Sequence, residues 1–572
     1  MYLDLKFAFR QLAKSPGFTV IALVTLALGI GLNTSMFSLM NQLVLQPLPY
    51  PAKNHLIRVY RTTPQSQNAG HSAPDYLDIA RGSKEFAVFA AFRMWGLTLA
   101  QADQPPVNLN ALRVSAGFFG ILGIQPELGR SFTPDEDALG NHVVMLSHAT
   151  WQAQFGGDPT VIGRTVRVDG EPTTIIGVMP AEFSSVFLWG PGDAFRPLAL
   201  TEAEKTDFKT SSLSIVGRFR SMETLNQVNS RLKVLAEHLA LHRPNKDSHD
   251  GLRAVSLQSV IQTRNTVQIS LLLLGVAGFV LLIACANLAN LQLARAIARM
   301  REYGIRTALG ASRRNLLGPL LAESLLLAMA GGCLGILVAV WSNAWMSSRL
   351  SENGFVVFKI SLDWRVVSFA LVISVLTGLV FGIIPAWLMS HVNLNDTLKT
   401  GARGSTGNRT QHRVRHALIV TQFALALVLL AGAGFFIRGV DRMLTRDLGW
   451  DSGHLLQGGI NLPQVKYSSP AQTYRFYTLL EDRLRTLPGV EQVSVSWALP
   501  LFQFSAARNY VVDGHATPPA GHEPLAFVNG ITPSYLETLK IKLIAGRNIS
   551  LTDVLAVTMQ WQWSRRLGSE WW

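Results

Sequence analysis

The chain has 572 residues, of which 48% are hydrophobic and only 15% are charged, a composition too apolar for an ordinary soluble protein of this size. A net charge of +14 would suggest nucleic-acid binding in a soluble protein, but here much of the excess lies beside long apolar runs. Retained cytoplasmic loops and contact with anionic membrane lipids explain the charge more simply, so nucleic acid is not expected as a partner. The two cysteines, Cys285 and Cys333, fall within apolar runs, and no disulfide scaffold is expected.

The N-terminal part predicts a first membrane span. Residues 1–17 are short and basic, and the apolar run at 18–41 is long enough to cross about 30 Å of hydrocarbon. A cleaved signal peptide would have a shorter apolar region followed by a small-x-small site, whereas this run continues through Leu39 and Met40. We therefore expect an uncleaved span with the N-terminus in the cytoplasm.

Residues 50–264 differ in kind from the apolar runs. Charges of both signs are mixed, Gly and Pro recur, and short β-branched runs alternate with turns. In the stretch 165–179, Asp169-Gly170 between two alternating segments predicts a β-hairpin. This pattern favours an extracytoplasmic α+β domain in two lobes.

The remaining chain alternates between apolar and polar segments. The predicted segments are a second span at 266–293, a cytoplasmic loop at 294–315, a third span at 316–345, a fourth span at 366–389, a basic linker at 391–415, a fifth span at 416–437 and a soluble region at 438–572. With five spans, all basic segments fall on one side of the membrane and both large polar regions fall on the other.

The loop at 294–315 is the most basic of these segments. Its arginines face a single acid, Glu302, which is followed four residues later by Arg306, the favourable order for a helical ion pair. Gly304 and Gly310 each cost a helix about 1 kcal/mol relative to Ala, which indicates close approach or a bend. The loop either fixes topology only, or it forms a short cytoplasmic helix on which a partner protein pushes.

Among individual residues, Glu323 stands out as an acid inside the third span. An ionisable residue in a membrane segment is a candidate for substrate or proton handling. It also lies close to the cytoplasmic end, where it could reach the headgroups or pair with Arg313 or Arg314. The sequence contains no G-x-x-x-x-G-K-[ST] phosphate cradle, no metal-binding spacing and no catalytic constellation, so neither an enzyme nor a cofactor is expected.

The region after the fifth span echoes the first domain. Residues 114–131 align without gaps to residues 531–548 at an offset of 417, with identical residues at Leu122/Leu539, Ile124/Ile541, Gly129/Gly546 and Arg130/Arg547. Since a span followed by a polar domain occurs twice, the pattern predicts a tandem duplication.

Several segments carry a family resemblance, among them REYGIRTALGASRRN at 301–315, SAPDYLDIARGSKEF at 72–86 and LSHATWQAQFGGDPTVIGRTVRVDGEPTTIIGVMP at 146–180. CANLANLQLARA at 285–296 and GARGSTGNRTQHRVRHALIVTQFALALVLLAGAG at 401–434 add to them. With this layout the chain resembles the MacB/FtsX family of ABC-transporter permeases, and within it the acidobacterial-type duplicated orphan permeases (ADOP). The resemblance implies a membrane protein whose α-helical transmembrane bundle is FtsX-like and whose extracytoplasmic α+β domains have the MacB-like periplasmic core fold.

The resemblance also implies a function and partners. A permease subunit in the bacterial inner membrane would work with a separate ABC ATPase and possible periplasmic adaptor, as a dimer or pseudo-dimer, to export antibiotic, peptide or lipoprotein-type substrates. The alternatives are a non-transport regulator or scaffold of a cell-envelope enzyme and a truncated, non-functional remnant. The residues expected to couple to the ATPase are Arg299, Glu302, Gly304, Ile305, Arg306, Leu309, Gly310 and Ala311.

The C-terminus departs from the family pattern. After residue 553 the family would continue through a second core domain and three more spans. This chain instead places Trp561, Trp563, Trp571 and Trp572 in its last twelve residues, without strand alternation or a helical stripe. We expect an out-of-frame tail on an incomplete second domain, that is, a C-terminally truncated product.

Overall fold

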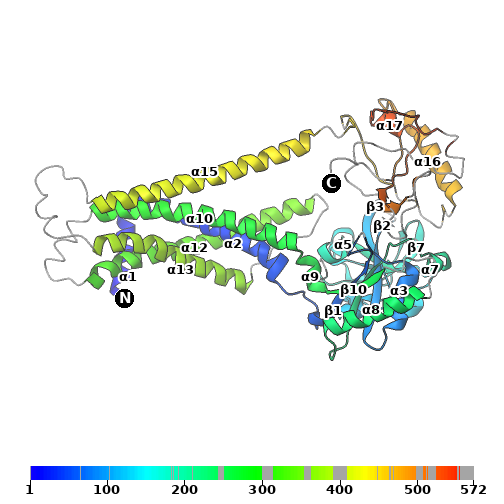
Figure 1. The fold of residues 1–572 in the computed structure, drawn as a ribbon, viewed down its shortest axis with the longest axis horizontal. Coiled ribbons are helices and arrows are strands. Elements are labelled where there is room, and N and C mark those ends of the chain that lie inside the picture. The colour runs from blue at the N-terminus through cyan, green and yellow to red at the C-terminus, as the bar shows by residue number, and fades with distance from the viewer. Residues whose placement is uncertain are drawn as a thin grey trace, which may run out of the picture. The chain divides into compact units, whose positions relative to one another are not determined.

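Two structural units, each with its own core, make up the chain in the computed structural model (Figure 1). The helical unit comprises residues 1–56, 182–192 and 255–441, and the α/β unit comprises residues 57–181, 193–254 and 442–572. The structure describes residues 2–64, 66–101, 104–181, 183, 186–190, 192–208, 210–241, 250–298, 313–352, 363–390, 409–446, 449–451, 453–460, 462, 466–467, 469–497, 507–510, 512, 524–550 and 553.

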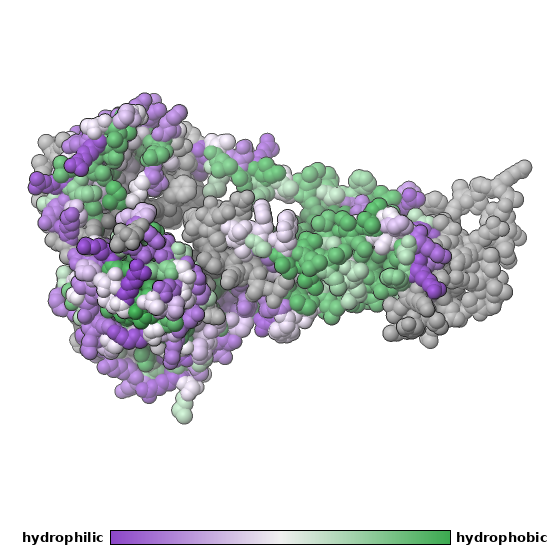
Figure 2. Space-filling model, turned by 180° about the vertical axis from the view of Figure 1, so that it is seen from behind, coloured by the Kyte–Doolittle hydropathy of each residue, from purple (hydrophilic) through white to green (hydrophobic). Residues whose placement is uncertain are grey.

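In this described part of the chain, five helices are long and apolar enough to cross a membrane. They are α2 (Pro16–Met40), α10 (Arg264–Ala298), α12 (Arg313–Glu352), α13 (Trp364–Ser390) and α15 (Arg409–Thr445). A shorter helix, α1 (Tyr2–Lys14), precedes them. Figure 2 shows apolar residues gathered over the long helices and hydrophilic residues over the α/β unit. The predicted class, a membrane protein with a helical bundle and an α+β domain, is confirmed.

Several helices run beyond the apolar segments from which the spans were predicted. Helix α10 continues to Ala298 and α12 begins at Arg313, so both enter the segment expected as a loop at 294–315. Helix α15 continues to Thr445, past the end of the fifth span expected at 437. The reason is that helical hydrogen bonds lie within the backbone and persist where side chains become polar. Apolar length therefore marks the membrane crossing and not the helix ends.

Small residues allow α2 and α12 to pack closely. A Cβ atom added to Gly31 would lie 2.9 Å from the carbonyl oxygen of Gly335, and one added to Gly335 would lie 3.0 Å from the backbone nitrogen of Gly31. Helix α13 also packs closely on α12, since a Cβ added to Gly378 of α13 would lie 2.9 Å from the Ala328 Cβ. Because lipid tails are as apolar as the helices, close backbone approach is a main source of helix association in membranes.

Buried polar side chains also join the helices. Asn33 on α2 is 2% exposed, and its Nδ2 donates to the carbonyl oxygens of Gly29 at 2.9 Å and Ala277 of α10 at 2.8 Å. Ser35 on α2 donates to Oδ1 of Asn343 on α12. An unsatisfied polar group is costly in an apolar interior, so these bonds favour one register of α2 against both neighbours.

The glycine contact gives a direct test of the bundle. We expect Gly31→Ala to lower the free energy of unfolding by about 1–3 kcal/mol, because the added methyl overpacks the α2–α12 contact. Gly275→Ala on α10 is the matched control, since its Cβ would meet nothing within 4 Å. Thermal unfolding of the detergent-solubilised protein compares the two, and equal melting temperatures would contradict the close packing.

The α/β unit is built on a ten-stranded sheet with the order β10-β1-β9-β2-β3-β8-β5-β7-β4, in which β6 pairs with β2 and β7. Its strands are β1 (Leu56–Thr62), β2 (Ala87–Gln101), β3 (Gln104–Val114), β4 (Leu128–Gly129), β5 (Val143–Leu146), β6 (Thr165–Val168), β7 (Glu171–Val178), β8 (Ala194–Pro197), β9 (Ser214–Phe219) and β10 (Gly251–Ser256). Its helices of five or more residues are α3 (Ala73–Gly82), α4 (Phe118–Leu122), α5 (His148–Phe155), α7 (Glu202–Thr206), α8 (Leu225–Leu241) and, after the fifth span, α16 (Pro470–Arg485). The latter region also holds α17 (Tyr535–Thr538), β11 (Ala507–Asn509) and β12 (Leu525–Phe527).

In the described residues the sheet carries two large hydrophobic cores and a smaller cluster formed by Ala73, Ala91, Leu198 and Leu213. One core joins β1, β9, β10 and the first half of β2 with α3 and α8. The other joins the second half of β2 with β3, β5, β6, β7, β8 and α5. The long strand β2 belongs to both cores, because its first part pairs with β9 and its later part with β3 and β6.

The β6–β7 hairpin is confirmed at the predicted turn. Val168 pairs with Glu171, which leaves Asp169 and Gly170 as the two turn residues, with φ angles of 54° and 87°. Positive φ at both positions defines a tight hairpin turn whose twist matches the flanking strands. The Asp-Gly dipeptide suits this turn because both residues tolerate a positive φ angle.

The internal repeat is visible in backbone geometry. Helices α4 and α17 lie at matching positions under the offset of 417, and both are followed by a residue with positive φ, Gly123 at 71° and Lys540 at 52°. At the start of the first copy, Ala91 of β2 and Ser115 exchange two hydrogen bonds. The Ala91 amide donates to Ser115 Oγ, and the Ser115 amide donates to the Ala91 carbonyl oxygen. Residues Val495 and Thr532 make the same pair of bonds in the second copy.

A paired arginine extends this repeat beyond the aligned sequence. Arg130 donates through both guanidinium nitrogens to Glu136, at 2.8 and 2.7 Å, and Arg547 does the same to Asp553, at 2.6 and 2.8 Å. The two acids are again 417 residues apart. The second copy thus follows the first through residue 553, and the tail that the sequence singled out lies outside the described residues.

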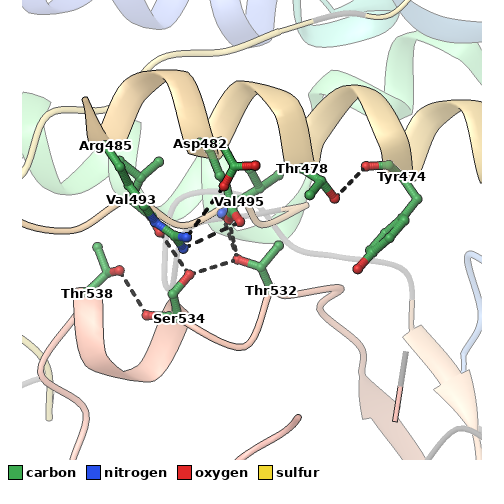
Figure 3. Close-up of polar contacts among 10 residues, drawn as sticks. Tyr474, Thr478, Asp482, Arg485, Val493, Val495, Thr532, Ser534 and Thr538 are labelled. Atoms are coloured by element: carbon green, nitrogen blue, oxygen red, sulfur yellow. Dashed lines mark hydrogen bonds and ion pairs between the residues drawn. The ribbon is translucent and has the colours of Figure 1, made fainter. Parts of the chain in front are cut away.

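The second copy also has half-buried polar contacts of its own, drawn in Figure 3. Thr532 Oγ1 donates to Glu481 Oε1 of α16 at 2.7 Å, and Ser534 Oγ donates to the carbonyl oxygen of Val493 at 2.8 Å. Glu481 is only 9% exposed, and Arg485 lies one turn further along α16 at 3.7 Å. These bonds hold α16 to the segment that begins the repeat.

The Arg130–Glu136 pair predicts a pH dependence. The Arg130 guanidinium lowers the pKa of the Glu136 carboxyl to about 2, below the value of about 4.3 in an unfolded chain. A lowered pKa contributes stability that is fully present above pH about 4.3 and is lost as the pH falls toward 2. We expect Glu136→Gln to reduce the loss of stability in urea unfolding between pH 5 and pH 3. The neighbouring change Asp135→Asn is the control, and an equal effect of both would contradict the prediction.

Candidate functional site

The segment expected to couple to a partner lies between two described helices. Helix α10 ends at Ala298 and α12 begins at Arg313. The eight predicted coupling residues, from Arg299 to Ala311, fall between these ends and lie outside the described residues. What the structure does describe is how the two flanking helices are held together at this end of the bundle.

A buried ion pair links those two helices. Arg295 on the last turns of α10 donates through Nη1 to Oε1 of Glu323 on α12, at 2.7 Å. The side chains are 18% and 5% exposed, respectively. Charge-assisted hydrogen bonds of this kind are strong, and a buried carboxylate without a partner would be very costly. The pair therefore fixes α10 against α12 directly before the coupling segment.

The same arginine also reaches the N-terminal helices. Its Nη2 donates to Ser15 Oγ at 2.6 Å, and its Cζ lies 4.1 Å from the centre of the Phe18 ring, a cation–π contact. We call Ser15, Phe18, Arg295 and Glu323 the Arg295 cluster. It brings together the α1–α2 junction, α10 and α12 through one guanidinium group.

Local sequence explains why Ser15 is in place. Ser15 stands between α1 and α2, directly before Pro16, which suits the first turn of a helix because its missing N–H would have no partner there. Ser15 Oγ donates to the Gln11 carbonyl at 3.2 Å, so its lone pairs remain available to Arg295. Thr19 Oγ1 bonds the carbonyls of Leu12 and Ser15 at 2.9 and 3.0 Å and holds the corner.

Sequence reasoning identified Glu323 and offered Arg313 or Arg314 as its partner. The structure pairs the carboxylate with Arg295, a residue that the sequence did not offer, while the side chains of Arg313 and Arg314 lie outside the described residues. The partners of Arg295 carried no local signal in the sequence, because these contacts depend on how α1, α2, α10 and α12 meet.

The Arg295 cluster joins helices to one another through hydrogen bonds and an ion pair. In the part of the chain that the structure describes, no group of three or more His, Cys, Asp or Glu residues could hold a metal ion. The Glu323 carboxylate is engaged by the Arg295 guanidinium. The arrangement can transmit a displacement of the segment after α10 to both α12 and α2.

This architecture, a set of membrane-length helices together with an α/β unit on a ten-stranded sheet, defines a class of membrane protein. Residues 19–235 match the MacB-like periplasmic core domain and residues 274–394 match the FtsX-like permease C-terminal domain. The chain therefore contains a MacB-like periplasmic core and an FtsX-like permease domain, as the sequence resemblance implied.

The chain is also similar in sequence to ABC-transporter permeases from bacteria. The chain is 26% identical over 273 residues to the uncharacterized ABC transporter permease YknZ of Bacillus subtilis, covering 48% of this chain and 65% of that protein. It is 25% identical over 301 residues to the macrolide export ATP-binding/permease protein MacB of Chromobacterium violaceum, covering 51% and 43%. The chain thus spans less than two thirds of the length of either relative.

Among solved structures, the chain is similar to the periplasmic region of MacB from Actinobacillus actinomycetemcomitans. The TM-score is 0.29 at 15% identity, and the match covers 37% of this chain and 94% of that one. The extracellular domain of the YknZ transporter from Gram-positive bacteria matches with a TM-score of 0.26 at 18% identity.

The ion pair yields a test in the purified protein. We expect Glu323→Met to lower stability by about 3 kcal/mol, because it leaves the Arg295 guanidinium buried without its carboxylate. Arg295→Met is the second single variant, and the double variant that combines the two substitutions should lose less than the sum of the single variants. Thermal unfolding in detergent measures all of them. Strict additivity would show that the two side chains do not interact.

Proposed function

We propose that this chain is the permease subunit of an ABC-type transporter, set in the bacterial inner membrane with its α/β domain in the periplasm. The observation that carries the proposal is the FtsX-like permease domain in a chain whose sequence has no G-x-x-x-x-G-K-[ST] motif. A chain that cannot cradle nucleotide phosphates needs a separate ATPase. Export of antibiotic, peptide or lipoprotein-type substrates is the corresponding activity.

The route of coupling follows from the Arg295 cluster. The ATPase would dock on the segment Arg299–Ala311, and movement there would pull on α10 and α12 at the ends that Arg295 and Glu323 tie together. Because Arg295 also bonds Ser15, α2 moves with them. After α2 the chain continues through Asn41–Leu45 and residues 46–55 into β1, and displacement of α2 on the cytoplasmic side would reach the periplasmic domain along this connection.

The finer assignment is a duplicated permease of the ADOP type. The repeated hydrogen-bond geometry at an offset of 417, including the Arg130–Glu136 and Arg547–Asp553 pairs, supports it. A duplicated chain would place two permease halves in one polypeptide and act as a pseudo-dimer. A periplasmic adaptor and contact with membrane lipids complete the set of proposed partners.

The coupling segment is tested by changes that keep its positive charge. Glu302→Lys with Gly310→Leu should preserve topology, since the loop remains basic. If the ATPase docks there, ATP hydrolysis that copurifies with the tagged chain should fall by roughly tenfold or more, which corresponds to about 1.4 kcal/mol of binding. Reporter fusions at residues 100 and 500 check that topology is intact.

The matched control is Glu202→Lys on α7, an exposed acid whose side chain is 86% accessible. This change makes the same charge reversal far from the loop in the sequence and should leave ATP hydrolysis unchanged. Undiminished hydrolysis in the Glu302→Lys, Gly310→Leu variant would make the segment a topological anchor only, and the proposed coupling would be wrong.

A further inference from the structure

Three arginines stand side by side on the sheet of the α/β unit. Arg93 of β2 pairs directly with Arg113 of β3, and Arg113 pairs directly with Arg196 of β8. Neighbouring strands are about 4.8 Å apart, and directly opposed residues point to the same face. The three side chains therefore form one row across three adjacent strands, which we call the arginine row.

The two outer members of the row have acidic partners. Arg93 Nη1 lies 2.6 Å from Oε1 of Glu204, the capping residue of α7. Arg196 Nη1 lies 3.7 Å from Oδ2 of Asp169 in the β6–β7 turn. Both arginines are largely buried, with 11% and 14% of their side chains exposed. Two acids thus serve three guanidinium groups.

Arg113, at the centre, has no acid of its own. Among the described residues it makes no hydrogen bond or ion pair, and its buried Nε has no partner. Burial is the main cause that lowers the pKa of Arg113, to about 10; the positive charges of Arg93 and Arg196 lower it further, and the acids Glu204 and Asp169 partly offset this. Like charges directly opposite on a sheet are destabilising. The row therefore carries an uncompensated positive charge in a partly desolvated place.

An aromatic ring fixes the orientation of this central group. The Arg113 Cζ lies 4.2 Å from the centre of the Trp95 ring, and the Arg93 Cζ lies 5.4 Å from it. Stacking of a guanidinium on an indole holds its plane while leaving its N–H edge free to donate. A planar fork of donors held in this way is suited to an oxyanion, which it can bind through two parallel hydrogen bonds.

We propose that the arginine row is a binding site for an oxyanion, a carboxylate or phosphate group, with Arg113 as its central ligand. The site lies in the MacB-like core domain and does not depend on the proposed transport function. Such a group could come from a small anion in the compartment or from a larger molecule that carries it.

The site can be tested on the purified full chain in detergent at pH 7. Inorganic phosphate and acetate are the probes, each compared with chloride at matched ionic strength. We expect at least one of them to raise the melting temperature by about 3 °C when its concentration is ten times its dissociation constant. Arg113→Gln should abolish this rise while retaining or raising the melting temperature measured in chloride, because it removes a like-charge repulsion.

The matched control is Arg167→Gln on β6. Arg167 is exposed and donates to the Gly170 carbonyl at 3.2 Å, so its loss removes one positive charge without touching the row. It should keep the rise caused by the anion. If Arg113→Gln does not fold, Arg196→Gln tests the neighbouring member of the row: it should also abolish the rise caused by the anion, but with a lower melting temperature in chloride because Asp169 loses its partner.

The outcomes separate cleanly. A rise that is present in the wild type and in Arg167→Gln but absent in the row variant supports the site. With phosphate alone the ligand is a phosphate group, and with acetate alone it is a carboxylate. No rise in the wild type, or equal rises in all three proteins, would overturn the proposal.

Discussion

A charged pair inside an apolar helical bundle is the constraint on which the membrane part depends. Glu323 is 95% shielded from solvent, and neither it nor Arg295 can leave the other without stranding a charge in a medium that solvates it poorly. This requirement ties α10 to α12 at one end of both helices. Because the same guanidinium also bonds Ser15, the first span is included in the arrangement.

Close packing and a buried hydrogen bond hold the same helices together at a second place. The Gly31–Gly335 contact brings α2 and α12 together at a second level, and Asn33 joins α2 to α10 through the Ala277 carbonyl. Helices held at two levels move more nearly as rigid bodies than helices held at one. A displacement at the α10–α12 connection would therefore be carried along the bundle, as the proposed coupling requires.

The α/β unit uses charge differently. Its cores are apolar, and its acids serve mainly as caps and arginine partners, as Glu204 does for both Thr201 and Arg93. Against this background, a central arginine with two positive neighbours has an electrostatic cost that its cation–π contact with Trp95 only partly offsets. A bound oxyanion would remove that cost. Because the like charges of the arginine row cost more than the Trp95 contact returns, we infer that the row binds an oxyanion and does not serve stability alone.

Local and one-dimensional features were determined by the sequence itself. Apolar runs located the five membrane-length helices, because crossing hydrocarbon sets a minimum length, and Asp169-Gly170 located a hairpin, because positive φ requires such residues. The internal repeat was also readable, since matching residues at one offset make matching hydrogen bonds. Tertiary structure alone decided the partners of Arg295 and the alignment of Arg93, Arg113 and Arg196. These groups are far apart in the chain, and contacts between them depend on helix rotation and strand register, which no local pattern of residues specifies.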